Sequence, residues 1–430
     1  MLHPTAAPIA PDEATKQIAA CVTADPKSTG AITQAPWGQT QLRFTDAWPL
    51  STGKGIRVAV IDTGVNPHPR FGTPVIAGGD YVSNTPGTTD CDGHGTIVAG
   101  IIAASSDPKE KTAFAGVAPD ATIISIRQSS KSYEPVAPKQ QTDKGGYGNL
   151  NTLARSVVRA VDLNAKVINI SEASCRPAAA RPGDGLLGAA LKYAADRDVV
   201  VVAAAGNVGG DCAPQNATAP QQPGIASASQ VSTVASPAWF SDNVLSVGWM
   251  AKDGTPSKYS LAGPWVGVAG PGEDITSLDP AGGATGLTNL LAEKPGAKLG
   301  AIQGTSFATP YVSGTVALVR ARFPTLSAKQ VIERIKATAH RPSGGWTPSV
   351  GYGMVDPVAA VSDVLPNDVS AQAANNSTAQ MPPPHARAAP DNTARNVAFI
   401  GSAAALAAAL ITFALLDVTR RHRRRREPQP

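Results

Sequence analysis

The chain has 430 residues, of which 42% are hydrophobic and 16% are charged, so it can bury a large core. The net charge of +5 is misleading, because six arginines within residues 417–430 give that segment +4 and leave about +1 for the rest of the chain. The basic residues are therefore not spread over a folded face, and we expect no nucleic-acid partner.

The N-terminal segment, residues 1–40, is short, polar and rich in Pro and Ala. Because it cannot bury a core alone, we expect it to be an extension that wraps a larger domain. That main domain is expected over residues 41–363, since one domain with tails fits the composition better than two equal domains.

An aliphatic run, Ile56–Ile61, predicts the first core strand, because a nearly continuous run of this kind is typical of a buried parallel strand. Asp62 follows at its carboxyl end, where open α/β sheets place ligands and chemistry, and Gly64 lets the chain turn.

Farther along, apolar residues after His94 indicate a helix that begins at His94: Ile97, Val98, Ile101 and Ile102.

Strand-like and helical segments then alternate along the chain, which predicts an α/β fold with a mostly parallel central sheet. Further strands are expected at Ala121–Ile126, Lys166–Ile170, Val199–Val202, Val244–Gly248 and Val266–Ala269, and helices at Leu150–Leu163 and Gly185–Arg197.

Another helix is expected to begin at Ser306, in the segment Gly304–Pro310. Residues at the spacing of one helical face follow, and Pro310 is compatible with a first turn: Phe307, Tyr311, Thr315, Leu318 and Arg322. A hydroxyl at a helix N-terminus lies beside unpaired backbone N–H groups and the positive end of the helix dipole, which both favour a developing oxyanion.

Asp62, His94 and Ser306 occur in the order Asp, His, Ser, each inside a signature segment: Val60-Ile61-Asp62-Thr63-Gly64, Asp92-Gly93-His94-Gly95-Thr96 and Gly304-Thr305-Ser306-Phe307-Ala308-Thr309-Pro310. Each segment alone is weak, since Asp-Thr-Gly also occurs in aspartic proteases and the others could be a loop and a helix cap. Together, in this order, they resemble a subtilisin-like serine protease. The resemblance implies a subtilisin-like three-layer fold and protein substrates.

The resemblance also implies the catalytic roles. Ser306 would be the nucleophile, His94 the general base and Asp62 the residue that orients His94. Asn207, at the end of the Val199–Gly206 run, would donate its side-chain amide to the oxyanion; the alternative is that it only supports a left-handed turn.

Substrate would add as an extended strand to an edge formed by Ser171, Glu172 and Ala173, as the resemblance implies. No metal or organic cofactor is needed, and we assign no calcium site because no loop is rich enough in Asp. The other histidines lack comparable sequence context and are expected at the surface: His3, His68, His340, His385 and His422.

Three stretches look like insertions relative to a minimal subtilase: Ser129–Asn149, Gly209–Val234 and Asp279–Leu299. Each follows a predicted strand and is rich in small, polar or Pro residues. Because they leave the carboxyl ends of strands, we expect at least some of them to line the rim of the active site. They could control access, dock a partner or be ordinary surface decoration.

The C-terminal part predicts a membrane anchor. Residues 364–396 are a Pro- and Ala-rich linker, and residues 397–416 contain no charge and are long enough to cross a bilayer as one helix. The alternative, an Ala-rich buried helix, fits poorly with the arginine-rich tail, residues 417–430, that follows. The positive-inside rule places this tail in the cytoplasm and the main domain on the external side. The chain would thus be anchored in the inner membrane of the cell.

An external domain requires export, yet residues 1–20 have neither the basic start nor the apolar segment of a signal peptide. We therefore infer that the natural signal peptide has been removed or replaced.

The four cysteines predict two disulfides, with three possible pairings, because the domain is expected outside the cell. Cys175 and Cys212 each follow a predicted core strand and would lie at the same edge of the sheet, so we expect them to pair. Cys21 then pairs with Cys91, beside His94. Metal binding is the weaker alternative, since no typical ligand spacing is present. The stapled extension could cover part of the cleft or be purely structural.

A subtilisin-like domain, a stapled extension, a linker, one span and a short basic tail together resemble a mycosin. Mycosins are membrane-anchored subtilases of mycobacterial type VII secretion systems. The resemblance implies a protease that processes secreted proteins and associates with the secretion complex and the lipid bilayer. The alternatives are a mainly structural subunit of that complex and, more remotely, an inactive subtilase.

Overall fold

The computed structural model describes residues 8–23, 32–106, 112–137, 146–180, 183–224, 230–292 and 296–365, all of which lie within one compact unit, Met1–Ala374. Almost all of the expected linker, the expected span at residues 397–416 and the basic tail lie outside the described residues. None of the helices within the described ranges is both long and apolar enough to cross a membrane.

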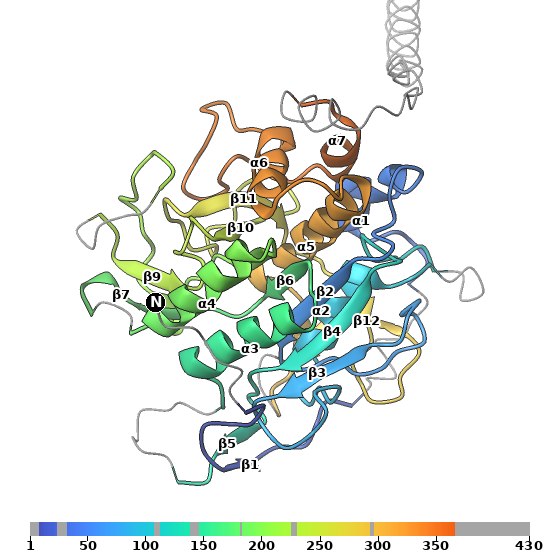
Figure 1. Cartoon of the computed structure of the whole chain (residues 1–430), viewed down its shortest axis with the longest axis vertical. Coiled ribbons are helices and arrows are strands. Elements are labelled where there is room, and N and C mark those ends of the chain that lie inside the picture. Colours follow the sequence, from blue (N-terminus) through green and yellow to red (C-terminus); the bar gives the residue numbers. More distant parts are fainter. Residues whose placement is uncertain are drawn as a thin grey trace, which may run out of the picture. The chain divides into compact units, whose positions relative to one another are not determined.

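A seven-stranded parallel sheet forms the centre of this unit (Figure 1). Its order is β11 (Val266–Pro271), β10 (Val244–Met250), β8 (Val200–Ala204), β6 (Val167–Ile170), β2 (Arg57–Asp62), β4 (Thr122–Arg127) and β3 (Ile76–Asp80). The crossover from β2 to β3 and the reversal at β6 are consistent with a doubly wound α/β sheet. The parallel α/β architecture expected from the sequence is confirmed.

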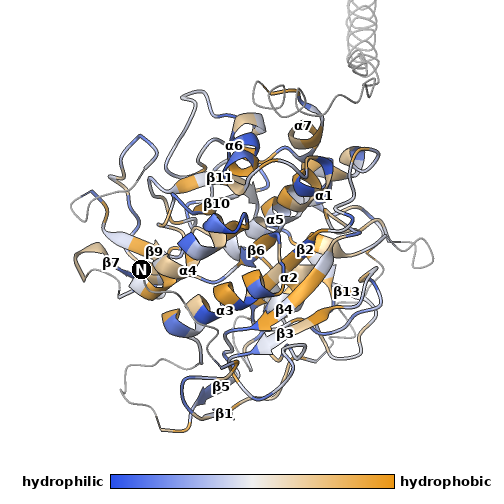
Figure 2. Ribbon diagram, viewed as in Figure 1, coloured by the Kyte–Doolittle hydropathy of each residue, from blue (hydrophilic) through white to orange (hydrophobic). Residues whose placement is uncertain are grey.

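Helices cover both faces of the sheet (Figure 1). On one face lie α2 (His94–Ala103) and α5 (Thr305–Arg322), and on the other lie α3 (Leu150–Asp162) and α4 (Gly185–Asp196). Alternation along β2 explains the two cores, because Val58 and Val60 face α2 and α5 whereas Ala59 and Ile61 face α3 and α4. The strands are therefore hydrophobic on both faces, as β2 and β4 show in Figure 2.

Helix α5 is buried on almost every side, unlike the one-sided helix that its sequence spacing predicts. It contacts β6, β8, β10 and β11 on its inner side and is covered by α6 (Ala328–Thr338) and α7 (Pro357–Ser362) on its outer side. A helix between two layers needs apolar or small residues all round, and this burial fixes the position of the helix N-terminus where Ser306 lies.

The N-terminal extension crosses the domain surface. Its strand β1 (Thr15–Gln17) pairs antiparallel with β5 (Tyr133–Pro135), and Asp12 forms an ion pair with Arg155 on α3, Nη2–Oδ1 2.5 Å. The disulfide Cys21–Cys91 follows. These contacts run from α3 to the loop before α2, so residues 8–23 of the extension end close to His94.

The remaining short elements lie outside the central sheet. The pair β7 (Ser174–Pro177) and β9 (Thr233–Ser236) is antiparallel, and Cys175 at β7 bonds Cys212 in η3 (Gly210–Cys212). Both disulfides thus join the same cysteines as the sequence predicts. The others are α1 (Trp37–Leu42), η1 (Phe44–Ala47), η2 (Ala178–Ala180), β12 (Ser277–Leu278), β13 (Leu287–Thr288), β14 (Leu290–Ala292) and β15 (Leu299–Ala301).

Candidate active site

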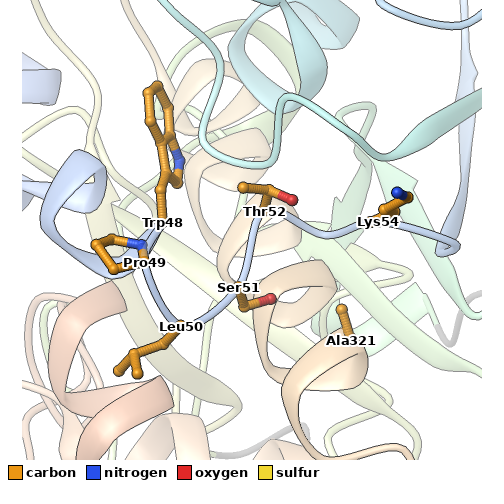
Figure 3. Close-up of a pocket in the computed structure, with 7 residues that line it drawn as sticks. All are labelled: Trp48, Pro49, Leu50, Ser51, Thr52, Lys54 and Ala321. Carbon is orange, nitrogen blue, oxygen red and sulfur yellow. The ribbon is translucent and has the colours of Figure 1, made fainter.

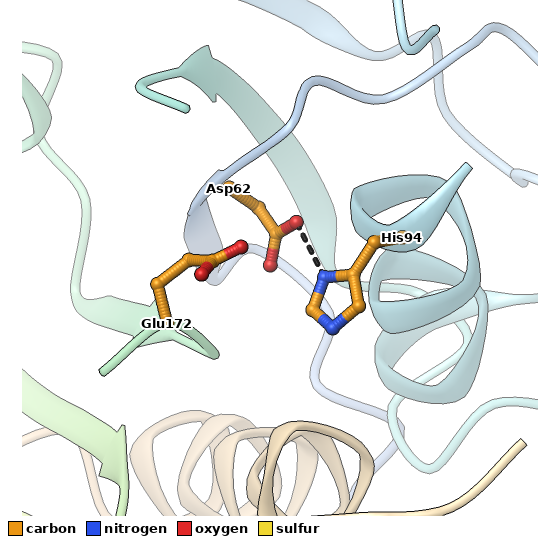
Figure 4. Close-up of side chains that lie close together, drawn as sticks. All are labelled: Asp62, His94 and Glu172. Carbon is orange, nitrogen blue, oxygen red and sulfur yellow. Dashed lines mark hydrogen bonds and ion pairs between the residues drawn. The ribbon is translucent and has the colours of Figure 1, made fainter. Parts of the chain in front are cut away.

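Asp62 is the last residue of β2 and is fully buried. Its Oδ1 accepts a hydrogen bond from the backbone N–H of Thr63 at 2.7 Å and lies 2.7 Å from Nδ1 of His94 (Figure 4). A buried carboxylate in contact with Nδ1 fixes the imidazole orientation and leaves the other ring nitrogen available for proton transfer. The sheet edge thus brings together two of the residues that the signature segments predict.

His94 is the first residue of α2, and the buried carboxylate of Asp90 holds this helix start in place. Asp90 accepts hydrogen bonds from the N–H groups of Gly93 and Thr96, both at 2.8 Å, and from the hydroxyl of Thr63 at 2.8 Å. One carboxylate therefore ties the end of β2 to the start of α2. The signature segments do not predict this role, because Asp90 lies outside them.

The environment makes His94 a stronger base than a free imidazole. Burial alone would lower its pKa, but the charge and hydrogen bond of Asp62, with a smaller effect of the Glu172 charge, raise the pKa to about 9. The imidazolium that forms during general-base catalysis is thereby stabilised.

Ser306 lies at the second position of α5 and is half-buried. The ring of the next residue, Phe307, packs against the His94 imidazole with centroids 5.0 Å apart, which places the N-terminus of α5 beside His94. In the described structure the Ser306 hydroxyl makes no hydrogen bond to His94. Such bonds are often long in substrate-free enzymes and shorten in the substrate complex.

A buried chain of hydrogen bonds holds the backbone of Ser306 on its inner side. The Ser171 hydroxyl donates to the Ser306 carbonyl at 2.7 Å, and the amide of Asn169 donates to the Ser171 hydroxyl at 2.9 Å. Asn169 in turn accepts from the hydroxyl of Ser313 on α5 at 2.8 Å. Pro310 explains the arrangement, because it lacks the N–H that would bond the Ser306 carbonyl in a regular helix.

Pro310 is the sixth residue of α5 and so lies in its second turn, which corrects the expectation of a first-turn proline. Ser171 is also almost fully buried, so its side chain faces α5 and not the cleft. Residues 171–173 pair with no strand in the described ranges, so their backbone edge remains open.

Asn207 follows β8 and is exposed, with its side chain anchored at one end. Its Oδ1 accepts hydrogen bonds from the backbone N–H of Thr305 at 2.9 Å and from the Thr305 hydroxyl at 3.0 Å. The Nδ2 group is therefore held beside the N-terminus of α5 with its protons directed away from these contacts. The Gly206 φ of +104° shows that the left-handed turn is made by glycine, so Asn207 is not needed for it.

Glu172 adds a second carboxylate to the Asp62–His94 pair. One ligand atom from each of the three residues lies within 4.8 Å of the others, and Figure 4 shows the Glu172 carboxyl group directed toward Asp62. Such a set could hold a metal ion, but the hydrogen bond between Asp62 and His94 already uses the atoms nearest to each other. We therefore interpret the set as a group of acid–base residues around His94 and not as a metal site. Sequence reasoning placed Glu172 at the substrate edge only.

His68 is buried, not at the surface as the sequence suggested. Its Nδ1 accepts from the backbone N–H of Arg70 at 3.1 Å and its Nε2 donates to the Gly286 carbonyl at 3.2 Å, so the ring is a neutral structural link. Burial lowers its pKa to about 4, although the Gly286 bond opposes this. His340 is exposed, as expected; the other three histidines lie outside the described residues.

Parts of two insertions lie beside this site. In the first, the Ser129 hydroxyl donates to Glu172 at 3.4 Å. In the third, the Pro280 carbonyl accepts a hydrogen bond from Asn66 at 2.7 Å, and the Pro280 ring lies against Gly93 at the start of α2. The expectation that some insertions line the rim of the site is met by these described parts.

A surface hollow of about 260 Å³ lies elsewhere (Figure 3). It includes Ala321, sixteen residues after Thr305 on α5, which corresponds to about 24 Å along the helix. The hollow is therefore remote from Ser306 and is not part of the catalytic site. It is lined by Trp48, Pro49, Leu50, Ser51, Thr52, Lys54 and Ala321.

Comparison with known proteins extends the similarity beyond the site. The sequence model of the subtilase family matches residues 53–353. Mycosin-4 of Mycobacterium tuberculosis is 48% identical over 414 residues, which are 96% of this chain and 88% of that protein.

Two solved structures agree with this. The first is described as the serine protease MycP1, an essential component of the type VII (ESX-1) secretion system; it is 43% identical with a TM-score of 0.73, over 84% of this chain and 99% of that one. The second is a chain of an intact ESX-5 inner membrane complex, 37% identical with a TM-score of 0.74, over 97% of this chain and 99% of that one. The likeness therefore covers much more than the catalytic segments.

Proposed function

We propose that this chain, which belongs to the subtilase family and within it to the mycosins, is a serine endopeptidase that cleaves exported proteins beside a type VII secretion complex. The observation that carries the catalytic part is the placement of Asp62, His94, Ser306 and Asn207 at one sheet edge, with the Asp62–His94 bond formed. These four residue types are the complete set that acyl transfer through a serine requires.

In the proposed mechanism, the Ser306 hydroxyl attacks the scissile carbonyl and gives its proton to Nε2 of His94. Asp62 stabilises the imidazolium, which then protonates the leaving amine. The oxyanion accepts hydrogen bonds from the Asn207 Nδ2 group and from the Ser306 backbone N–H at the start of α5. A water molecule, activated by His94, then attacks the carbonyl of the acyl-enzyme in the same way. This hydrolysis releases the acid product and restores the Ser306 hydroxyl.

We place the substrate backbone along residues 171–173. Their edge pairs with no strand in the described part of the chain, and they follow β6 directly, so an extended peptide can add there. Since Ser171 points into the protein, the contacts of this residue with substrate would be made by its backbone.

Association with a secretion complex is proposed from the relatives. A chain similar over nearly its whole length is part of an ESX-5 inner membrane complex, and another is described as an essential component of the ESX-1 system. The apolar residues 397–416 and the arginine-rich tail support anchoring in the inner membrane with the protease domain outside. We further propose domain limits of residues 41–363, with residues 364–396 as the linker.

The expected membrane span and the long insertions favour a second role. A membrane span and long insertions are unnecessary for cleavage alone, so the chain could also stabilise the secretion complex, with proteolysis secondary. The two roles are compatible, and variants that lack either the Ser306 hydroxyl or the membrane anchor would separate them.

The catalytic proposal is tested with a fluorophosphonate probe and peptide cleavage. We expect Ser306 to be labelled in the wild type, and Ser306→Ala and His94→Ala to lose labelling and cleavage while keeping the thermal unfolding midpoint. In subtilisin, removal of the serine or histidine costs about a millionfold in kcat, and removal of all three residues costs little more. Labelling at another residue, or cleavage by Ser306→Ala, would show that the nucleophile is assigned wrongly.

A further inference from the structure

The two oxygens of the Asp62 carboxylate have very different surroundings. Oδ1 accepts the His94 and Thr63 hydrogen bonds, both at 2.7 Å. Oδ2 is buried and has no hydrogen-bond partner among the described residues. Leaving a buried charged acceptor unpaired is costly, so a donor beside Oδ2 would stabilise the ionised form of Asp62 that orients His94.

Glu172 is an ionisable group close to Asp62 that is not bonded to it. It lies within 4.8 Å of the Asp62–His94 pair, and Figure 4 shows its carboxyl group facing the Asp62 carboxylate. One of its oxygens, Oε1, accepts the Ser129 hydroxyl at 3.4 Å. No hydrogen bond to the second oxygen, Oε2, is found among the described residues. A carboxylic acid can donate from that oxygen, whereas a carboxylate cannot.

We propose that Glu172 is a positioning residue of the triad, which as the neutral acid donates a hydrogen bond to Oδ2 of Asp62, directly or through one water. This inference rests on the proposed function and adds a fourth side chain to the Asp62–His94 pair. Glu172 would act through Asp62 and not on substrate. Its proton remains on Glu172 throughout the reaction.

The surroundings of Glu172 favour the neutral acid. Burial first, and then the negative charge of Asp62, raise the pKa of Glu172, whereas the charges of His94 and Lys131 and the Ser129 hydrogen bond oppose this. The opposing effect of His94 requires an imidazolium. When His94 is neutral, as general-base catalysis requires, this opposing effect is absent and protonation of Glu172 is favoured further. With Glu172 neutral, its charge no longer helps to raise the pKa of His94, and that rise then rests on Asp62.

The test uses the full chain in detergent and compares three forms: wild type, Glu172→Gln and Glu172→Met. Gln keeps a neutral donor, while Met fills a similar volume without one. The main measurement is the rate of Ser306 labelling by a small fluorophosphonate from pH 5 to 10, because this probe does not need the substrate-binding edge. Loss of a hydrogen bond to a charged group corresponds to roughly tenfold to a hundredfold in rate, so we expect that loss in Glu172→Met and near wild-type rates in Glu172→Gln.

The pH profile identifies the protonation state. If Glu172 is neutral, Gln changes no charge, and the pH at half-maximal labelling stays where it is in the wild type. If Glu172 were ionised, Gln would remove a negative charge beside His94 and move that midpoint to lower pH by about one unit or more. Such a shift, an equally slow Gln variant, or an undiminished Met variant would each overturn the proposal.

Controls separate this inference from the proposed function. Glu134→Gln, at a partly exposed Glu on β5 whose ion-pair partner is Lys16, is the matched control and should label at the wild-type rate. Ser306→Ala should not label at all. Labelling of Ser306→Ala would refute the proposed function, whereas the outcomes at Glu172 refute only the positioning role.

Discussion

At the residue scale, catalysis depends on side chains that connect elements, not only on those that react. Asp90 joins the end of β2 to the start of α2 through bonds to Thr63, Gly93 and Thr96. Burial raises the pKa of Asp90 to about 6, although the hydrogen bonds from Thr96 and Thr63 oppose the rise. Part of the geometry at His94 is therefore fixed by a carboxylate that never contacts substrate.

A first prediction concerns His68, a buried neutral link between Arg70 and Gly286. Its pKa is about 4 in the folded state and 6.5 in the unfolded chain, so its contribution to the free energy of unfolding is full above pH 6.5 and is lost as the pH falls toward 4. The difference between these two pKa values corresponds to at most about 3 kcal/mol of unfolding free energy.

We expect urea unfolding of the Ser306→Ala protein, which cannot digest itself, to show this loss between pH 7 and pH 4.5. His68→Asn should be less stable at pH 7, since it keeps the acceptor for Arg70 but not the Gly286 bond. Its stability should, however, fall less over the same range. Equal pH dependence in both proteins would contradict the prediction.

The candidate catalytic residues could be selected from sequence because each lies in a short local segment. Their supporting residues could not. Glu172 and Asp90 acquire their roles from contacts made across the fold, with Asp62 and with the start of α2 respectively. His68 was misjudged for the same reason, since burial of a histidine depends on the segments packed over it.

At the element scale, the core strands were predictable because each is rich in Val, Ile, Leu or Ala, with only single polar residues or glycines between the apolar ones. The edge strand β3 (Ile76–Asp80) was not, since Gly78 and Gly79 interrupt its apolar pattern. Helix α5 begins at Thr305, one residue before the expected start, and its burial on both sides removes the one-sided pattern used to predict it.

A second prediction concerns Pro310 in α5. Ser171→Ala removes the only side-chain donor to the Ser306 carbonyl among the described residues, which should cost about 1–3 kcal/mol of unfolding free energy. Adding Pro310→Ala supplies a backbone N–H four residues after Ser306, so the double variant should regain part of the loss. The double-mutant cycle in urea should give a favourable coupling of about 1 kcal/mol. Strictly additive effects would mean that the Ser171 bond does not replace the missing helical one.

A third prediction concerns the staple of the N-terminal extension. Replacing Cys21 and Cys91 together by Ser should lower the unfolding free energy by about 2–4 kcal/mol, because the link closes a large loop in the unfolded chain. The matched control replaces Cys175 and Cys212. Non-reducing peptide mapping of the wild type should recover only these two links.

The same variant decides between the two roles of the extension. If the extension covers part of the cleft, loss of the staple should raise the rate of peptide cleavage; if it is purely structural, only stability should fall. A reactive Cys91 thiol in the native wild type would contradict the pairing itself.

At the scale of the whole molecule, the described domain is a complete protease fold, yet similar chains belong to membrane secretion complexes. Holding a protease beside a pore raises its effective concentration for emerging substrates. It also gives the insertions beside the active site a fixed position relative to other subunits. Overall architecture was predictable because strand and helix patterns alternate regularly, whereas the paths of the insertions depend on contacts such as that of Pro280 with Asn66.

The last prediction is that assembly depends on the anchor and catalysis on the nucleophile. Deletion of residues 397–430 should release a soluble domain that still cleaves peptides but no longer supports secretion. Ser306→Ala should keep the membrane complex intact and lose only substrate processing, because the hydroxyl contributes little to any surface. Native gels and secretion assays in cells complemented with each variant measure both functions.

A further variant separates anchoring from specific contacts of the span: residues 397–416 are replaced by an unrelated apolar helix of the same length. If anchoring alone matters, this chain should restore secretion, since it keeps the domain at the membrane surface. If the span itself binds other subunits, the replacement should localise correctly and still fail to assemble. Loss of the complex in Ser306→Ala, to the same extent as in the anchor deletion, would show that the two roles are not separable.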